Sequence, residues 1–192
     1  MFYFKSDGTV SYSNQYEGEW TIYAKDLVGN AKTYTLKMDC KPPTISGVTN
    51  EGYYKTASPT ITDYTSMLYV MTKNGSSYTW SSGESITSEG TYVLTAIDDV
   101  GFTNNVTFYI DGTNPTISGV TNGTYYSSAV TPTISDNMAL SHCTLNGNAY
   151  TSGTKISAAG NYTLIAYDKS GRSTTYTFTI DLTNPTISNV TN

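Results

Sequence analysis

Apolar and polar residues alternate in three segments of this chain, and the three segments match one another. At every second position each of them has an aromatic residue, an aliphatic residue, Ala and then Asp. The segments are residues 20–26, 92–98 and 162–168. A period of two is typical of a β-strand that turns one face toward a core. The small Ala predicts a point at which an opposing sheet comes close.

A turn and a second strand are expected after each of these segments. The closing Asp lies three residues before a Gly, namely Gly29, Gly101 or Gly171. This spacing predicts a type I turn followed by a Gly at positive φ. Alternation then resumes in a return strand, and each return strand ends on another Asp. These Asp residues are Asp39, Asp111 and Asp181.

The strand pairs belong to a repeat of about seventy residues. The tetrapeptide Pro-Thr-Ile-Ser begins at Pro43, Pro115 and Pro185, at spacings of 72 and 70 residues. Between the copies, further short strands are predicted at 59–63 and 67–73 and at their counterparts 132–136 and 139–145. The Asn-Gly pairs after residues 73 and 145 predict tight hairpins. A fixed period indicates an array of one unit, and many short strands without a helical period predict a β-sandwich.

The repeat divides the chain into four parts. We expect an incomplete unit at 1–39 with the later strands only, complete units at 40–111 and 112–181, and the start of another at 182–192. Aligning Asp7-Gly8 with Asn74-Gly75 places Met1 near Leu68, so the first part lacks two strands. Its inward residues should therefore be more exposed than their counterparts in the next unit. The two sets are Trp20, Ile22, Leu36 and Met38 against Tyr92, Leu94, Phe108 and Ile110.

The run at 160–171 resembles the penultimate-strand motif of bacterial immunoglobulin-like (Big) domains. That motif reads Gly-x-Tyr-x-aliphatic-x-Ala-x-Asp-x-x-Gly-Asn. Gly29-Asn30 keeps its final pair, whereas Phe102 and Arg172 replace the Asn in the other copies. The resemblance implies an all-β chain of tandem Ig-like β-sandwiches in an elongated array. It also implies the surface or cell wall of a Gram-positive-type bacterium, with neighbouring repeats as the nearest partners.

Composition narrows the function classes. With 38% hydrophobic and only 13% charged residues, the chain is too apolar for disorder. A net charge of −5 argues against nucleic acid as a partner, because binding phosphates needs a basic face. No apolar run reaches the roughly 18–20 residues of a membrane span. The two cysteines, Cys40 and Cys143, occupy non-equivalent positions of the repeat and are expected to be free thiols.

Catalysis is not expected. The only histidine, His142, has no counterpart in the neighbouring unit, so no Ser-His-Asp or Cys-His pair can recur. The repeated Asp residues fall at turns and strand ends rather than in a paired arrangement. A single active site copied in successive units would be unusual. We therefore predict a protein that is not an enzyme.

Three Asp positions recur in each complete unit, and they raise the alternative of calcium. They are Asp63, Asp98 and Asp111, followed by Asp136, Asp168 and Asp181. Calcium takes six to eight oxygen ligands, often from several carboxylates. The connectors 111–115 and 181–185 resemble the Asp-Thr-Thr-Ala-Pro linkers of giant adhesins, which implies calcium at Asp63, Asp111, Asp136 and Asp181. Because Asp also caps turns on its own, we expect turn roles and no cofactor, with calcium as the alternative.

The function predicted from these observations is that of a non-catalytic spacer or stalk segment of an extracellular bacterial surface protein. The alternatives are an adhesive or carbohydrate-binding module, or accessory domains of a secreted glycoside hydrolase. Trp80 lies in a stretch rich in Ser and Thr and is the candidate for a surface contact with a glycan or host ligand. Aromatic faces suit such contacts because they combine an apolar surface with a polar rim.

The connectors generate a prediction about shape. Each has only three residues between its Asp and its Pro, at 112–114 and 182–184, and Pro restricts the residue before it to extended conformations. Small-angle scattering on residues 40–181 should therefore give a radius of gyration well above that of a compact chain of equal length. A compact value would contradict the expected array.

Overall fold

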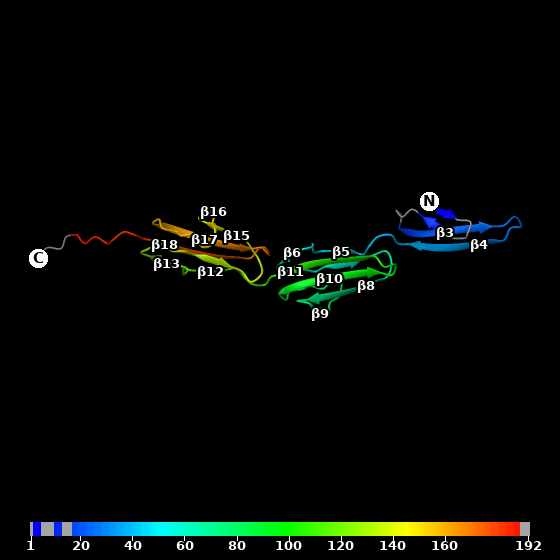
Figure 1. Ribbon diagram of the computed structural model, residues 1–192, viewed down its shortest axis with the longest axis horizontal. Helices are drawn as coiled ribbons and strands as arrows, with labels where there is room; N and C mark the ends of the chain where they lie inside the picture. Colours follow the sequence, from blue (N-terminus) through cyan, green and yellow to red (C-terminus); the bar gives the residue numbers. More distant parts are fainter. Residues whose placement is uncertain (1, 5–9, 13–16, 189–192) are drawn as a thin grey trace. The chain divides into compact units, whose positions relative to one another are not determined.

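The computed structural model describes residues 2–4, 10–12 and 17–188, and the regular structure of this part of the chain consists of β-strands (Figure 1). The chain forms two compact units. One comprises Met1–Gly52, Ala57–Ser85 and Thr91–Phe108, and the other Tyr53–Thr56, Ile86–Gly90 and Tyr109–Asn192. No described residues form a helix long and apolar enough to cross a membrane.

The N-terminal part contains two antiparallel strand pairs. They are β1 (Phe2–Phe4) with β2 (Val10–Tyr12), and β3 (Gly18–Lys25) with β4 (Ala31–Met38). Asp7 and Gly8, which were aligned with Asn74-Gly75, lie outside the described residues. In β3 and β4, Trp20 is 37% exposed, Ile22 and Leu36 are half-buried and Met38 is 8% exposed. Their four counterparts are each 0% exposed, which confirms the predicted difference.

Two successive repeats then share one topology. The strands of the first are β5 (Thr44–Ser46), β6 (Gly52–Tyr54), β7 (Thr60–Thr62), β8 (Met67–Lys73), β9 (Ser76–Tyr78), β10 (Gly90–Asp98) and β11 (Thr103–Ile110). Those of the second are β12 (Thr116–Ser118), β13 (Thr124–Tyr126), β14 (Thr133–Ser135), β15 (Leu140–Leu145), β16 (Asn148–Ala149), β17 (Gly160–Asp168) and β18 (Ser173–Ile180). Each repeat has a five-stranded sheet, β6-β11-β10-β8-β9 or β13-β18-β17-β15-β16, and a two-stranded sheet, β5-β7 or β12-β14. The fold class is therefore all-β, with immunoglobulin-like sandwich sheets, as predicted.

Turn chemistry sets the register of the long hairpins. Asn146 and Gly147 have φ values of 50° and 80°, the positive values of a tight hairpin turn, and Asn74 with Gly75 repeats them at 50° and 79°. After β10, Gly101 has φ 98° and donates its amide to the Asp98 carbonyl at 3.3 Å. Both turn predictions are confirmed.

One pairing was not predicted from the sequence. The short strand β13 runs parallel to β18, with Thr124 opposite Phe178 and Tyr126 opposite Ile180. Tyr126 packs against the core and approaches Phe178 edge-on at 6.1 Å, whereas Tyr125 is 77% exposed. A three-residue strand with a distant partner leaves no local pattern from which its pairing could be deduced.

The core of the last repeat fills the space between its two sheets. Leu164 and Ala166 of β17 are fully buried, and Phe178 packs beside them from β18. Ile117 and Ile134 contribute from the two-stranded sheet. The predicted inward face of the penultimate strand is thus confirmed. Because alternation continues to the end of the strand, it also carries an Asp into the buried row.

This packing predicts the cost of enlarging Ala166. Ala166→Leu should lower the free energy of unfolding by about 1–3 kcal/mol, because a fully buried Ala in a close-packed core leaves no room for three further carbon atoms. The matched control is Ala24→Leu in β3, where the equivalent Ala is exposed and the change should stay within about 0.5 kcal/mol. Urea unfolding measures both. Equal effects for the two variants would show that the strand face is assigned incorrectly.

Candidate metal centres

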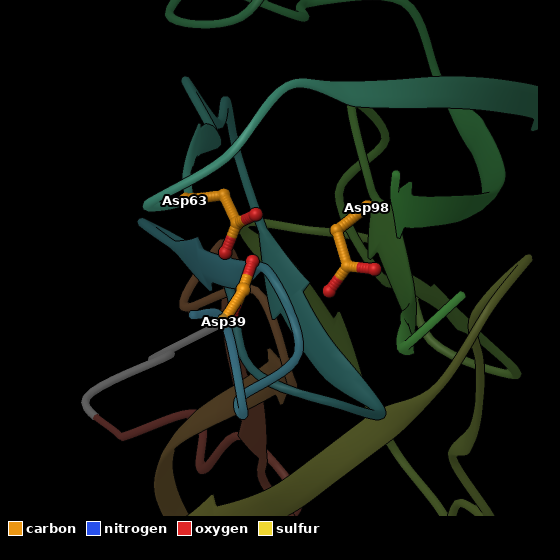
Figure 2. Close-up of side chains that lie close together, drawn as sticks. All are labelled: Asp39, Asp63 and Asp98. Carbon is orange, nitrogen blue, oxygen red and sulfur yellow. The ribbon is translucent and has the colours of Figure 1, made fainter. Parts of the chain in front are cut away.

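Three Asp side chains come together at two places, and each set combines the Asp after one return strand with two Asp residues of the following repeat. Asp39, Asp63 and Asp98 each offer a carboxylate oxygen, and these oxygens lie within 4.8 Å of one another. We call them the first triad. Figure 2 shows its carboxylates converging from three separate segments. Asp111, Asp136 and Asp168 form a second triad under the same distance limit.

Equivalent elements position the members of both triads. Asp39 and Asp111 follow the last residues of β4 and β11, the two return strands. Asp63 and Asp136 follow the short strands β7 and β14. Asp98 and Asp168 end the penultimate strands β10 and β17 and continue their core-facing rows. The triads are therefore a product of the repeat itself.

In the second triad every Asp uses one carboxylate oxygen to hold its own loop. Asp111 Oδ1 accepts the Thr113 amide at 3.1 Å. Asp136 Oδ2 accepts the amides of the residues two and three positions later at 3.0 and 2.9 Å. Asp168 Oδ1 accepts the Arg172 amide at 2.8 Å and the hydroxyl of Ser170 at 2.9 Å. These bonds fix the carboxylates before any ligand arrives.

The other oxygen of each carboxylate is buried and unpaired. Asp111 Oδ2, Asp136 Oδ1 and Asp168 Oδ2 have no hydrogen-bond partner among the described residues. Asp111 is 0% exposed and Asp168 2%. Burying a charged group without a partner is costly, so native proteins supply a proton, a cation or a donor at such places.

The electrostatics of the second triad point the same way. Burial raises the pKa of the Asp111 carboxyl above its ordinary value, and the nearby carboxylates of Asp136, Asp168 and Glu89 raise that pKa further. The Thr113 amide acts in the opposite direction. Three ionised carboxylates in a buried cluster repel one another, and a bound cation would remove this repulsion.

The donor set suits a hard divalent cation. All the converging atoms are carboxylate oxygens, which calcium and magnesium prefer over nitrogen or sulfur ligands. Three carboxylates supply part of a calcium shell, and carbonyl groups or water usually complete it. The residues present therefore fit calcium at both triads.

The first triad differs in how its oxygens are occupied. Asp98 Oδ1 accepts the amides of Val100 and Phe102 at 3.0 and 2.9 Å, and its Oδ2 is buried without a partner in the described part of the chain. The Thr65 hydroxyl lies 2.5 Å from Asp39 Oδ2 and 3.1 Å from Asp63 Oδ2. One hydroxyl thus occupies the space between two of the three carboxylates.

The structure corrects the grouping that the repeat predicts for these Asp residues. The repeat groups Asp111 with Asp63 and Asp98 of its own unit, but in the structure Asp111 joins Asp136 and Asp168, which follow it in the chain. Asp39 was not proposed as a ligand, although its position after a return strand was a usable signal. The Asp after β4 and the Asp after β11 each lie beside two Asp residues of the following repeat.

Asp181 and Trp80, two further predicted site residues, lie elsewhere. Asp181 belongs to neither triad among the described residues; its Oδ1 accepts the amide and hydroxyl of Thr183 at 2.9 and 2.5 Å. Trp80 is only 8% exposed, meets Tyr69 edge-on at 5.7 Å, and donates Nε1–H to the Glu84 carbonyl at 2.9 Å. The surface position expected for Trp80 is wrong, because its ring fills core space.

The remaining candidate groups are consistent with incidental roles. His142 is exposed and stacks on Tyr167, with ring centroids 4.5 Å apart. Cys40 and Cys143 are both free thiols, as predicted, and Cys143 is buried in the core of the last repeat.

Comparison with known proteins gives a distant likeness only. No family model matches the chain, and no curated protein matches it. A chimeric titin Z1Z2-Z1Z2 tandem carrying a GRGDS peptide from fibronectin is 16% identical, with 72% of this chain and 98% of that one covered and a TM-score of 0.31. The titin domains Z1Z2 in complex with telethonin are 14% identical, with coverages of 78% and 100% and a TM-score of 0.27.

A third solved structure comes from a glycan-utilisation system. It is the Bacteroides ovatus mixed-linkage glucan utilization locus protein SGBP-B, in complex with a mixed-linkage heptasaccharide. It is 15% identical, covers 94% of this chain and 63% of its own, and has a TM-score of 0.25. Likenesses of this strength carry no argument about function, so the function has to be argued from the triads.

Proposed function

We propose that this chain is a non-catalytic spacer segment of an extracellular bacterial surface protein, and that calcium bound at the two Asp triads stabilises its repeats. One observation carries the calcium proposal. The same three Asp positions converge in both triads, and in each triad at least one buried carboxylate oxygen has no partner among the described residues. Because the buried acidic cluster recurs at equivalent positions, it is a feature of the repeat and does not depend on the conformation of a single loop.

The mechanism is a crosslink between segments that are far apart in the sequence. The second triad holds the end of β11, the loop after β14 and the end of β17. A bound calcium ion supplies the positive charge that neutralises the three carboxylates. The protein holds each carboxylate through the oxygen that accepts hydrogen bonds from its own loop. The side chains therefore lose little conformational freedom when the ion binds. A ligand present at a hundred times its Kd stabilises the folded state by about 2.7 kcal/mol.

An extracellular location fits sites of this kind. Calcium sites of extracellular modules typically have Kd values of about 10⁻⁴–10⁻³ M. Sites as weak as these stay filled only where calcium is abundant. The spacer role rests on the repeat, because an array of self-contained units acts through its number of units and their stability. The burial of Trp80 removes the residue on which glycan binding was based.

The proposal predicts that the effect of one substitution on the melting temperature changes sign when calcium is added. Without calcium, Asp168→Asn should raise the melting temperature of its repeat, because it removes one of three mutually repelling charges, for a gain of about 1 kcal/mol. With millimolar calcium the same variant should melt below the unmodified protein, because a ligand is lost. Thermal unfolding followed by circular dichroism, in chelator and in calcium, measures both differences.

Asp181→Asn provides the matched control, since Asp181 is exposed and lies outside both triads among the described residues. Its effect should be the same with and without calcium. The calcium proposal fails if calcium leaves the melting temperature of the unmodified protein unchanged, or if Asp168→Asn and Asp181→Asn respond alike.

A further inference from the structure

The two triads have equivalent Asp positions but different surroundings. They differ first in how many of their buried carboxylate oxygens have no hydrogen-bond partner. In the second triad all three Asp residues present a buried oxygen without a partner among the described residues, whereas in the first triad only Asp98 does. In the second triad, Asp111 and Asp168 are at most 2% exposed, so their free oxygens lie away from solvent. A cation entering the second triad displaces no protein donor.

The first triad already holds a donor that a cation would have to displace. The Thr65 hydroxyl lies within hydrogen-bond distance of both Asp39 and Asp63. The equivalent position, two residues after the loop Asp, is Met138 in the second triad, and a methionine has no hydroxyl to offer. Thr65 therefore partly satisfies the acidic cluster from within the protein.

A glutamate supports the second triad from behind. Glu89 Oε2 accepts the Gly112 amide at 3.1 Å and the Thr113 hydroxyl at 2.6 Å, and Glu89 Oε1 accepts the Asn137 side-chain amide at 2.5 Å. Gly112 directly follows Asp111, and Asn137 directly follows Asp136. Glu89 thus ties together the loops that carry two of the three ligands, as partners behind metal ligands commonly do.

Among the residues that the structure describes, no equivalent brace supports the first triad. Glu17 stands 22 residues before Asp39, as Glu89 stands before Asp111. Glu17 instead pairs with the exposed side chain of Lys41, Nζ to Oε2 at 2.8 Å, in the place that Thr113 takes in the second triad. An ion pair with a flexible, exposed lysine restrains the loop weakly, and the lysine adds positive charge near Asp39.

One cationic group also lies near the second triad. Arg172 Nε donates to the backbone carbonyl of Asp111 at 3.0 Å. This bond engages the carbonyl rather than a carboxylate, and the three free carboxylate oxygens remain unpaired within the described structure. Arg172 therefore orients the Asp111 loop through the backbone and does not pair with the free carboxylate oxygens.

We propose that the triads are calcium sites of unequal strength: the second, braced by Glu89, fills first, and the first is weakened by the Thr65 hydroxyl. This inference rests on the proposed function, because it presumes that the triads take calcium. Glu89 is a positioning residue in this scheme, acting through the Asp111 and Asp136 loops. The repeats would then acquire their bound ions in a fixed order as calcium rises.

Calorimetric titration of the metal-free full chain with calcium chloride tests the order. We expect two binding phases whose affinities differ at least about tenfold, in keeping with the usual effect of partners behind metal ligands. Asp168→Asn should abolish the tight phase, and Asp98→Asn should abolish the weak one. If Asp98→Asn abolishes the tight phase, or if the unmodified chain shows a single phase with two equivalent sites, the inference is wrong.

Two further variants and one matched control separate the proposed causes. Glu89→Gln should weaken the tight phase by about tenfold and leave the weak phase unchanged, while the matched variant Glu17→Gln leaves the tight phase unchanged. Thr65→Val should strengthen the weak phase several-fold, because it removes the competing donor at almost constant shape. An unchanged tight phase in Glu89→Gln would overturn the role of Glu89, and a weaker first site in Thr65→Val would make Thr65 a ligand instead of a competitor.

Circular dichroism in chelator confirms that each variant is folded, so that a lost phase reports a lost site. The failure of this inference is distinguishable from failure of the proposed function. No binding heat and no calcium-dependent melting shift in the unmodified chain would overturn the proposed function itself. Two calcium ions bound with equal affinity would overturn only the inequality of the sites.

Discussion

A carboxylate buried at the end of the penultimate strand constrains the rest of the repeat in both complete repeats. Strand periodicity places Tyr92, Leu94 and Ala96 in the core, and two residues later the same periodicity places Asp98 in the same buried row. Asp168 follows Leu164 and Ala166 in the same manner. The strand cannot bury its apolar residues without also burying the Asp. The loops around it must therefore supply partners for a charge that the sheet has withdrawn from water.

The surrounding loops meet only half of this demand. Their amides and hydroxyls satisfy one oxygen of Asp98 and of Asp168, and the other oxygen of each is buried without a partner among the described residues, on a side chain that lies beside two more carboxylates. Further carboxylates beside a buried carboxylate raise the free energy of the cation-free state through repulsion. A bound cation removes that repulsion. This imbalance is the physical basis for assigning the triads to calcium, and it is more pronounced in the second repeat than in the first.

Much of the fold could be predicted because its signals are local. Alternation fixed the inward faces of β10 and β17, and Asn-Gly pairs fixed the hairpins after β8 and β15. Features that depend on distant partners were missed. The parallel pairing of β13 with β18 has no local pattern, and nothing in its neighbourhood distinguishes buried Trp80 from an exposed aromatic residue.

The candidate site shows the same division. The recurrence of Asp63, Asp98 and Asp111 was visible in the sequence, but their grouping was not, because it depends on which repeat receives the end of a return strand. Sequence spacing therefore assigns Asp111 to the wrong set and leaves out Asp39. The contacts of Glu89 and of Thr65 depend on loop geometry that no spacing rule encodes.

A crystal structure of the chain grown in calcium would test the central claim most directly. The account predicts a cation in the second triad, about 2.3–2.6 Å from Asp111 Oδ2, Asp136 Oδ1 and Asp168 Oδ2, the usual range for calcium and oxygen. Its identity can be verified by anomalous scattering. Carboxylates that instead share protons, paired directly with one another around a centre free of metal at neutral pH, would contradict the account.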